Sequence, residues 1–209
     1  SAMLECMQEK QITVSGKPYQ LDQPFFVMAT QNPIEQEGTY PLPEAQLDRF
    51  QFKLLVDFPG REELAMILDR TTTTEEPQPQ KIIGRDEIRR WMQFVRQTVV
   101  APHLQDYAVR LVLATHPESK YSTDQVKRFV RFGGSPRGAQ SIILAAKIKA
   151  LRAERYNVAF ADIAAAALPA LRHRLVLNFE AEAEGVTPDM ILSDMLNAVP
   201  RDVPDFAAK

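Results

Sequence analysis

Hydrophobic and polar positions follow two different patterns along this chain. Apolar residues first come in short runs rich in β-formers, at Phe25–Ala29 and Phe50–Val56, which is typical of buried strands. After Phe58-Pro59-Gly60 they recur at helical spacing, and no convincing strand follows. The pattern therefore predicts a mostly α protein in which residues 1–58 belong to an α/β unit and residues 59–209 form an all-helical domain.

Short elements are predicted in the first part of the chain. Residues 1–9 have the amphipathic pattern of the end of a helix. Because the sequence starts inside that helix without an initiator methionine, we expect an upstream part to be missing. Gln11–Val14 and Tyr19–Leu21 flank Ser-Gly-Lys-Pro, which predicts a β-hairpin. Pro43–Asp48 is predicted to be a short helix with Pro43 at its first helical position.

Helices are predicted throughout the second part. A polar connector that contains prolines, Thr71–Gln80, follows the first of them. Gly133-Gly134 is expected to end the fourth as a C-cap, and Glu180–Gly185 is expected to be an acidic loop. The predicted helices are Arg61–Arg70, Arg85–Val99, His103–Thr115, Thr123–Phe132, Pro136–Arg155, Ala159–Leu177 and Pro188–Ala198.

Composition limits the cellular compartments in which the protein is expected and the classes of partner that it is expected to bind. The 209 residues are 45% hydrophobic and 25% charged, an ordinary globular composition, and the net charge of −2 gives no general attraction to nucleic acid or to an anionic membrane. No apolar run reaches the roughly 18 residues of a membrane span. The single cysteine, Cys6, cannot form an internal disulfide, and the scattered histidines give no metal-binding pattern. We therefore expect a cytoplasmic protein.

A phosphate loop is missing from the sequence. Such a loop has the pattern G-x-x-x-x-G-K-[ST], but Pro18 follows the only Gly-Lys pair, Gly16-Lys17. The acidic pair that holds Mg²⁺ is also missing, because Phe58 follows Asp57 where a glutamate is expected. The polypeptide alone is therefore not expected to hydrolyse ATP.

Two polar residues stand at the ends of predicted elements. Asn32 follows the first apolar run, where an amide can position water against a phosphate, or can simply start a turn. Arg49 ends the predicted short helix, where its forked guanidinium suits phosphate oxygens, although a cation at a helix C-terminus is common for its dipole alone. The neighbouring Glu35 and Glu37 are given no role.

Arg137 is the third candidate. In Gly134-Ser135-Pro136-Arg137-Gly138, the serine is a good N-cap and the proline suits the first helical position, so Arg137 falls in the first turn. A cation there opposes the helix dipole, whereas an anion is favoured. The arrangement indicates that a phosphate joins Arg137; a solvated arginine at a helix start is the alternative.

Two stretches resemble the MoxR branch of the AAA+ ATPases: ATQNP at residues 29–33 and LPEAQLDRF at residues 42–50. The resemblance extends to about Pro200. It implies the C-terminal half of an α/β P-loop AAA+ core, residues 1–58, followed by a helical lid. It also implies Asn32 as sensor 1, Arg49 as an arginine finger acting on the neighbouring subunit's ATP, and Arg137 as sensor 2 contacting ATP in its own subunit.

The same resemblance implies a function for the intact parent protein. The expected cofactors are ATP and Mg²⁺, held mainly by residues that are missing from this sequence. The expected assembly is a homo-oligomeric ring, a hexamer, that remodels or matures protein clients, including proteins with von Willebrand factor A domains. The hairpin at residues 11–21 is expected either to project from the ring or to be a plain surface ribbon.

Two other functions stay open at this point. The helical part alone fits a non-catalytic module that binds a protein partner, in which case ATP has no effect on binding. A helical DNA-binding domain is a weaker alternative, because it requires a salt-dependent affinity for duplex that the acidic net charge disfavours.

Overall fold

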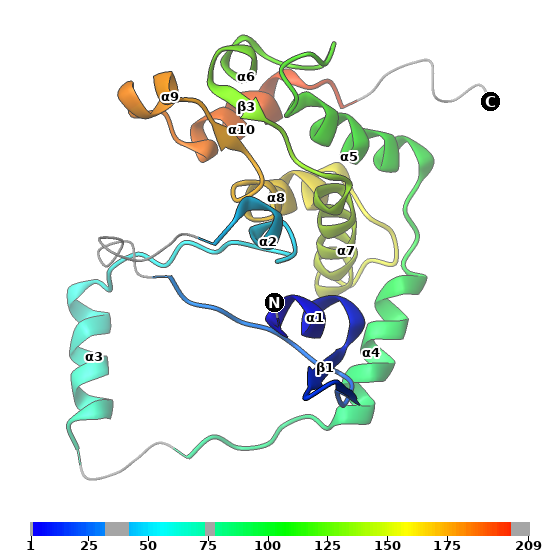
Figure 1. The fold of residues 1–209 in the computed structure, drawn as a ribbon, viewed down its shortest axis with the longest axis vertical. Coiled ribbons are helices and arrows are strands. Elements are labelled where there is room, and N and C mark those ends of the chain that lie inside the picture. Colours follow the sequence, from blue (N-terminus) through cyan, green and yellow to red (C-terminus); the bar gives the residue numbers. More distant parts are fainter. Residues whose placement is uncertain (1, 32–41, 74–77, 202–209) are drawn as a thin grey trace.

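The structure is a computed structural model that describes residues 2–31, 42–73 and 78–201. It is mostly helical, as predicted, and the helices that follow residue 101 lie close together (Figure 1). The described helices are α1 (Ala2–Glu9), α2 (Glu44–Leu47), α3 (Arg61–Thr71), α4 (Arg85–Gln97), α5 (Pro102–Ala114), α6 (Asp124–Phe129), α7 (Pro136–Arg152), α8 (Phe160–Leu171), α9 (Phe179–Ala183) and α10 (Pro188–Ala198).

The predicted β-hairpin is confirmed. Strand β1 (Gln11–Val14) pairs antiparallel with β2 (Lys17–Gln20). The two turn residues, Ser15 and Gly16, have φ values of 50° and 77°. Both therefore adopt the left-handed conformation that a tight two-residue hairpin requires. Helix α1 is tied to the hairpin because the Glu5 carboxylate accepts a hydrogen bond from the Thr13 amide at 3.1 Å.

The two apolar runs predicted as buried strands are not strands in this chain. Residues 25–29 and 50–56 form no strand and have no ladder partner among the described residues. Several of their large side chains are exposed, with Met28 at 84% and Val56 at 93% of full accessibility, whereas Phe52 packs partly against the core. The reason is that a strand is stabilised only by neighbouring strands and by cover on its faces, and the described residues supply neither.

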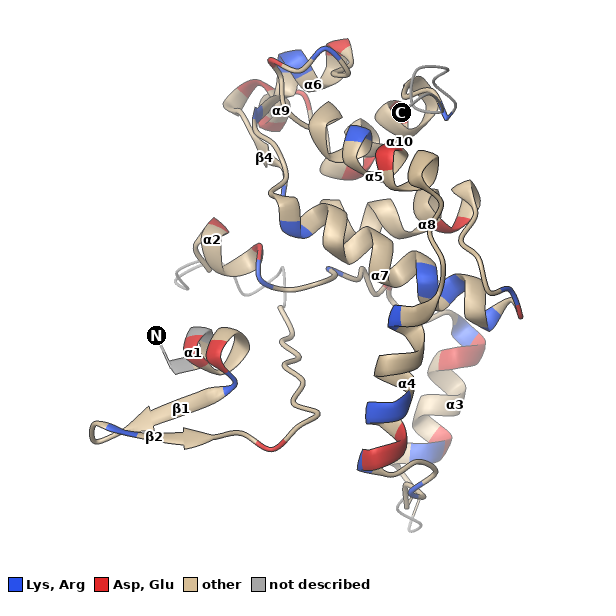
Figure 2. Cartoon of the chain, turned by 90° about the vertical axis from the view of Figure 1, so that its right-hand side faces the viewer, with Lys and Arg blue, Asp and Glu red and all other residues tan. Residues whose placement is uncertain are grey.

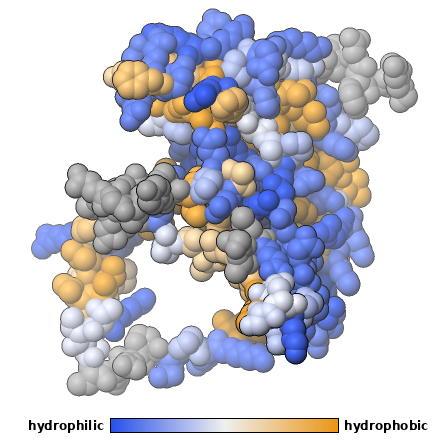
Figure 3. Space-filling view, in the orientation of Figure 1, coloured by the Kyte–Doolittle hydropathy of each residue, from blue (hydrophilic) through white to orange (hydrophobic). Residues whose placement is uncertain are grey.

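Helices α3 and α4 lie at the margin of the structure. Neither of them contains a buried residue. Apolar side chains gather on the surface of α3 (Figure 3), where Leu64, Ile67 and Leu68 are all exposed. Part of the predicted connector before α4, residues 74–77, falls outside the described residues.

The hydrophobic core lies between α5, α7, α8 and α10. Helix α7 packs against both α8 and α5, and α10 packs against α8. Alanines with no exposed surface line these contacts, among them Ala146, Ala150 and Ala167. Small side chains let the helix axes approach closely, while larger ones such as Tyr107 and Ile142 fill the remaining space. This packed group of helices supports the site described below.

Several predicted helices end earlier than expected: the second ends at Gln97 and not Val99, the fifth at Arg152 and not Arg155, and two others stop before an unexpected pair of strands. The prediction extended the fourth to Phe132 and the sixth to Leu177, but β3 (Val130–Phe132) and β4 (Val176–Leu177) pair antiparallel instead. Helical spacing alone did not reveal this pair, because a long-range contact decides it. The predicted acidic loop is also wrong in part, since α9 forms there: the Asn178 side chain accepts a hydrogen bond from the Ala181 amide and caps the helix.

The glycine pair after β3 does not cap a helix, contrary to the prediction, because α6 ends at Phe129. A Cβ atom on Gly133 would lie 2.6 Å from the Thr115 Oγ1, so no side chain fits. The Gly134 amide donates to the same hydroxyl at 2.8 Å, and the His116 ring bonds the Gly134 carbonyl at 3.0 Å. The glycines therefore let the loop before α7 lie directly on the end of α5.

Candidate functional site

The three sequence-predicted residues have different outcomes. Asn32 lies outside the described residues, as do Glu35 and Glu37. Arg49 comes just after Asp48, the C-cap residue of α2, and Arg137 lies in the first turn of α7. Helix α2 lies beside α7 and α8 (Figure 1), so the segment that carries Arg49 is close to Arg137.

The start of α7 forms as its sequence predicts. Ser135 is the N-cap residue, its hydroxyl accepts a hydrogen bond from the Arg137 amide at 3.2 Å, and Pro136 opens the helix. The Arg137 side chain keeps 44% of its surface exposed. A partly exposed guanidinium beside a helix N-terminus is a donor set that fits a phosphate group.

An anion of the chain itself occupies this helix start. The Asp48 Oδ2 accepts a hydrogen bond from Arg137 Nη1 at 3.0 Å, and the Asp48 Oδ1 accepts one from the Ser135 hydroxyl at 2.6 Å. The helix dipole and the arginine both favour a negative charge here. The physical argument from sequence predicted an anion at this position, and the described structure supplies Asp48.

Asp48 also pairs with a second, buried arginine. Arg174 Nε donates to Asp48 Oδ1 at 3.0 Å, and only 1% of the Arg174 side chain is exposed. The other Arg174 nitrogens donate to backbone carbonyls, including those of Asp48 and Phe50 at 2.9 and 2.8 Å. The carbonyls of Gln51 and Ala170 accept further bonds from Arg174. A buried guanidinium is stable only when its donors are satisfied in this way.

The two residues before Arg174 hold the same segment. His173 Nε2 donates to the Phe50 carbonyl at 3.0 Å, and Arg172 Nη1 donates to the Lys53 carbonyl at 3.3 Å. The Lys53 amide donates in turn to the Pro169 carbonyl at 2.9 Å. Residues 172–174, which follow α8, therefore hold residues 48–53 by hydrogen bonds to their backbone.

Burial and charge set the protonation of this cluster. Burial opposes ionisation of Asp48, but the hydrogen bonds from Ser135 and Arg137 and the charge of Arg174 hold its pKa below the usual value. Burial lowers the pKa of His173 to about 4, and the bond to the Phe50 carbonyl only partly opposes this shift. At neutral pH the cluster thus contains an ionised Asp48, two guanidinium ions and a neutral imidazole.

Arg49 lies inside residues 48–53, the segment that residues 172–174 hold. The carbonyls of its two neighbours, Asp48 and Phe50, both accept hydrogen bonds from Arg174. The Nε and Nη1 atoms of Arg49 are enclosed and have no hydrogen-bond partner among the described residues. Unsatisfied guanidinium donors favour an anion, but these two atoms are enclosed in this arrangement, so an anion reaches them only when their surroundings open.

Sequence reasoning did not single out Asp48, Arg174 or His173. Asp48 stood next to the candidate finger in the quoted stretch but was given no role. Arg172-His173-Arg174 is a run of three basic residues just after Pro169, which was a usable signal for a polar contact. Nothing local in the sequence indicates that this run meets residues 48–53.

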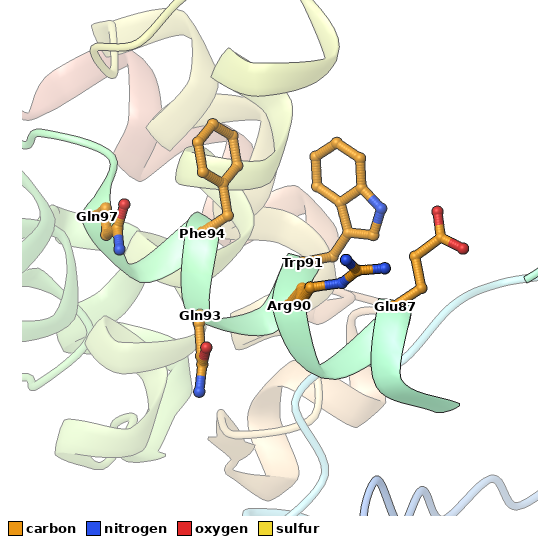
Figure 4. A pocket seen from close by; sticks show the side chains of 6 residues that line it. All are labelled: Glu87, Arg90, Trp91, Gln93, Phe94 and Gln97. Atoms are coloured by element: carbon orange, nitrogen blue, oxygen red, sulfur yellow. The ribbon is translucent and has the colours of Figure 1, made fainter. Parts of the chain in front are cut away.

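Other surfaces of the described residues give weaker indications of a functional site. A hollow along α4 is lined by side chains of that one helix (Figure 4), so it is not enclosed by several elements. Figure 2 shows acidic and basic residues interspersed on α3 and α4. In residues 2–31, 42–73 and 78–201, no group of three metal-ligating side chains gathers, and no helix combines the length and apolarity of a membrane span. The residues lining the hollow are Glu87, Arg90, Trp91, Gln93, Phe94 and Gln97.

Comparisons with known proteins agree with each other. Residues 1–52 match the ATPase family associated with various cellular activities (AAA), and residues 123–195 match the AAA lid domain. Over 95% of its length the chain is 41% identical to Chaperone MoxR1 of Mycobacterium tuberculosis, of which it covers 52%. It is also 28% identical to Protein MoxR of Paracoccus denitrificans, covering 90% of this chain and 59% of that protein.

A solved structure gives the same picture. A crystal structure described as a candidate ATPase from Cytophaga hutchinsonii superposes with a TM-score of 0.88 and 38% identity, covering 95% of this chain and 60% of that one. The chain thus spans between 52% and 60% of the length of the curated relatives it matches.

Proposed function

Because the chain belongs to the MoxR family of AAA ATPases, we propose that it supplies the arginine finger, the sensors and the lid of an ATPase that remodels or matures partner proteins. The observation that carries the proposal is 41% identity to a chaperone over 95% of this chain. The phosphate loop and the acidic pair for Mg²⁺ belong, in this proposal, to a longer protein that extends upstream of this sequence.

The described residues have distinct roles in the proposal. Arg137 binds the nucleotide of its own subunit from the lid, and its exposed guanidinium at a helix N-terminus supports this role. Arg49 stabilises charge on the nucleotide of the neighbouring subunit; two of its guanidinium nitrogens lack partners among the described residues, and this role requires them to become accessible. Asn32 orients the attacking water. In the longer protein, the water would attack the γ-phosphorus of ATP and break its bond to ADP, releasing ADP and inorganic phosphate, and Mg²⁺ would offset the negative charge of the phosphates.

The proposed assembly is a cytoplasmic homo-oligomeric ring, a hexamer, in which each finger reaches its neighbour. The clients are proteins, and the class we expect includes proteins with von Willebrand factor A domains. Support for a chaperone-like role comes from the identity to MoxR1. The hydrolysis cycle would move the lid relative to the core and transmit force to the client.

The two arginines give the proposal a test by geometry. In the longer protein, Arg137→Ala should weaken both nucleotide affinity and turnover, whereas Arg49→Ala should spare binding and stop hydrolysis. Removing a finger lowers the rate by about 10³ to 10⁵. The polypeptide of this sequence alone should show no turnover. Steady turnover that Arg137→Ala abolishes would show that the upstream loop is not required.

Mixed rings separate action in the same subunit from action across an interface. Arg49→Ala subunits keep a competent pocket, and subunits with a defective phosphate loop keep a competent finger. Mixing the two should restore activity at interfaces where the finger of one meets the pocket of the other. If mixed rings form and no activity returns, Arg49 does not act on a neighbour. If the longer protein has no ATPase activity at all, the proposed function is wrong.

A further inference from the structure

Asp48 lies between the two proposed nucleotide contacts. Its carboxylate accepts from Arg137, and its backbone is bonded to Arg174 and followed by Arg49. We propose that Asp48 is a positioning residue that couples nucleotide contact at Arg137 to the placement of Arg49. This inference rests on the proposed function and extends it, because it joins one subunit's own pocket to the finger that subunit offers its neighbour.

The first argument is the rigidity of the segment around Arg49. Arg174 Nη2 bonds the carbonyls on both sides of Arg49, at 2.9 Å to Asp48 and 2.8 Å to Phe50. The backbone of Arg49 is therefore fixed relative to the C-terminal end of α8. A shift of the Asp48 side chain is transmitted to this backbone, because the two are one residue apart and share Arg174.

The second argument is that Arg174 is more buried than Arg137 and makes more hydrogen bonds. Arg174 is enclosed, and four carbonyls besides the Asp48 carboxylate accept from it. Arg137 keeps 44% of its side-chain surface exposed, and Asp48 is its one bonding partner for Nη1 among the described residues. Arg174 is thus the fixed partner of Asp48, and Arg137 is the partner that can move to another anion.

The third argument is charge. One carboxylate faces two guanidinium ions, so the cluster of Asp48, Arg137 and Arg174 carries a net positive charge. A phosphate anion is attracted to this cluster and competes with Asp48 for Arg137. When Arg137 turns to phosphate, Asp48 remains bonded to Ser135 and Arg174. Asp48 therefore competes with the nucleotide for Arg137. When Arg137 leaves, the Asp48 side chain loses one of its donors and can shift, and this shift moves the segment that carries Arg49.

The competition predicts effects of opposite sign on binding and turnover. In the full-length protein, Asp48→Asn removes the competing charge, so Kd for a slowly hydrolysed ATP analogue should fall by about fivefold, within the usual range of coupling between sites. The same change loosens the segment around Arg49, so kcat should fall by about 10-fold to 100-fold, the size that a misplacement of 1 Å produces. Mere destabilisation of the lid would weaken binding instead.

A matched control is available in the lid. Asp162 also forms a close pair with an arginine, Arg155, at 2.8 Å, and only 7% of its side chain is exposed, but it does not contact residues 48–53. Asp162→Asn should not tighten nucleotide binding. In an Arg137→Ala background, Asp48→Asn should no longer change Kd, because the arginine through which it acts is gone.

The outcomes decide between the proposals. The coupling is overturned if Kd is unchanged or raised in Asp48→Asn, or if the gain in nucleotide affinity persists in the Arg137→Ala background. The proposed ATPase function still holds in that case, provided that the wild-type protein turns over ATP. A wild-type protein without turnover overturns both. If Asp48→Asn fails to fold, Asp48→Glu carries the test: it keeps the charge but changes its reach, so an unchanged Kd with slower turnover supports the coupling, and an unchanged turnover overturns it.

Discussion

Arg174 is the residue whose loss should most weaken the attachment of residues 48–53 to the lid. We predict that Arg174→Met, which keeps the length of the side chain but removes its charge and donors, destabilises the chain. The variant removes the Arg174 donor from the carbonyls of Asp48, Gln51 and Ala170, whereas the Phe50 carbonyl keeps its bond from His173. The Asp48 carboxylate keeps its bonds from Ser135 and Arg137, which limits the cost.

The magnitude follows from the burial of the pair. Removing one partner of a buried ion pair costs about 3–5 kcal/mol, and the two remaining donors on Asp48 place the expected value near the lower end, about 3 kcal/mol. For a chain of 150–250 residues, each kcal/mol lowers Tm by about 2–4 °C, so Tm should fall by about 6–12 °C. Thermal unfolding followed by circular dichroism measures this directly.

The control is an arginine that also bonds carboxylates but is exposed. Arg128 pairs with Glu180 and Glu184, and 53% of its side chain is accessible. Exposed ion pairs contribute little to stability, so Arg128→Met should lower Tm by less than about 4 °C. Equal Tm shifts for the two variants would refute the argument that Arg174 is the buried anchor. Faster hydrogen exchange at the Lys53 amide in Arg174→Met would support it, because that amide bonds Pro169 at the same contact.

Two further predictions concern pH and packing. Because burial lowers the pKa of His173 to about 4, its neutral form stabilises the fold fully above the unfolded pKa and less as pH falls toward 4. The free energy of unfolding in urea should fall by about 1–2 kcal/mol between pH 7 and 5, and His173→Gln should remove this part of the slope. Gly133→Ala should cost about 1–3 kcal/mol, because its Cβ would lie 2.6 Å from Thr115 Oγ1. Gly84→Ala, where a Cβ meets nothing within 4 Å, is the control, and equal Tm values for the two would contradict the clash.

Local signals in the sequence were sufficient wherever the structure depends on local contacts. The hairpin formed in the predicted place, although its turn is Ser15-Gly16 alone and Lys17 and Pro18 belong to β2, and α7 began where Ser135 and Pro136 indicated. The helices around the core followed from apolar spacing. The predicted division into residues 1–58 and 59–209 stays a prediction.

Contacts between distant residues were not predictable in this way. The Asp48–Arg174 pair joins residues 126 positions apart, and no periodicity relates them. The pairing of β3 with β4 is likewise decided by residues far apart in sequence. The apolar runs at residues 25–29 and 50–56 have the composition of buried strands, yet composition cannot supply the neighbours that a strand needs.

The start of α7 shows what a physical argument from sequence can and cannot specify. A cation in the first turn of a helix is unfavourable unless an anion joins it, so the presence of Arg137 there predicts an anion. The argument does not distinguish a carboxylate from a phosphate, because both carry negative charge and accept bonds from a guanidinium. The structure places Asp48 in that position at 3.0 Å. Two anions that suit one arginine will compete for it, and the proposed coupling between Arg137 and Arg49 follows from that competition.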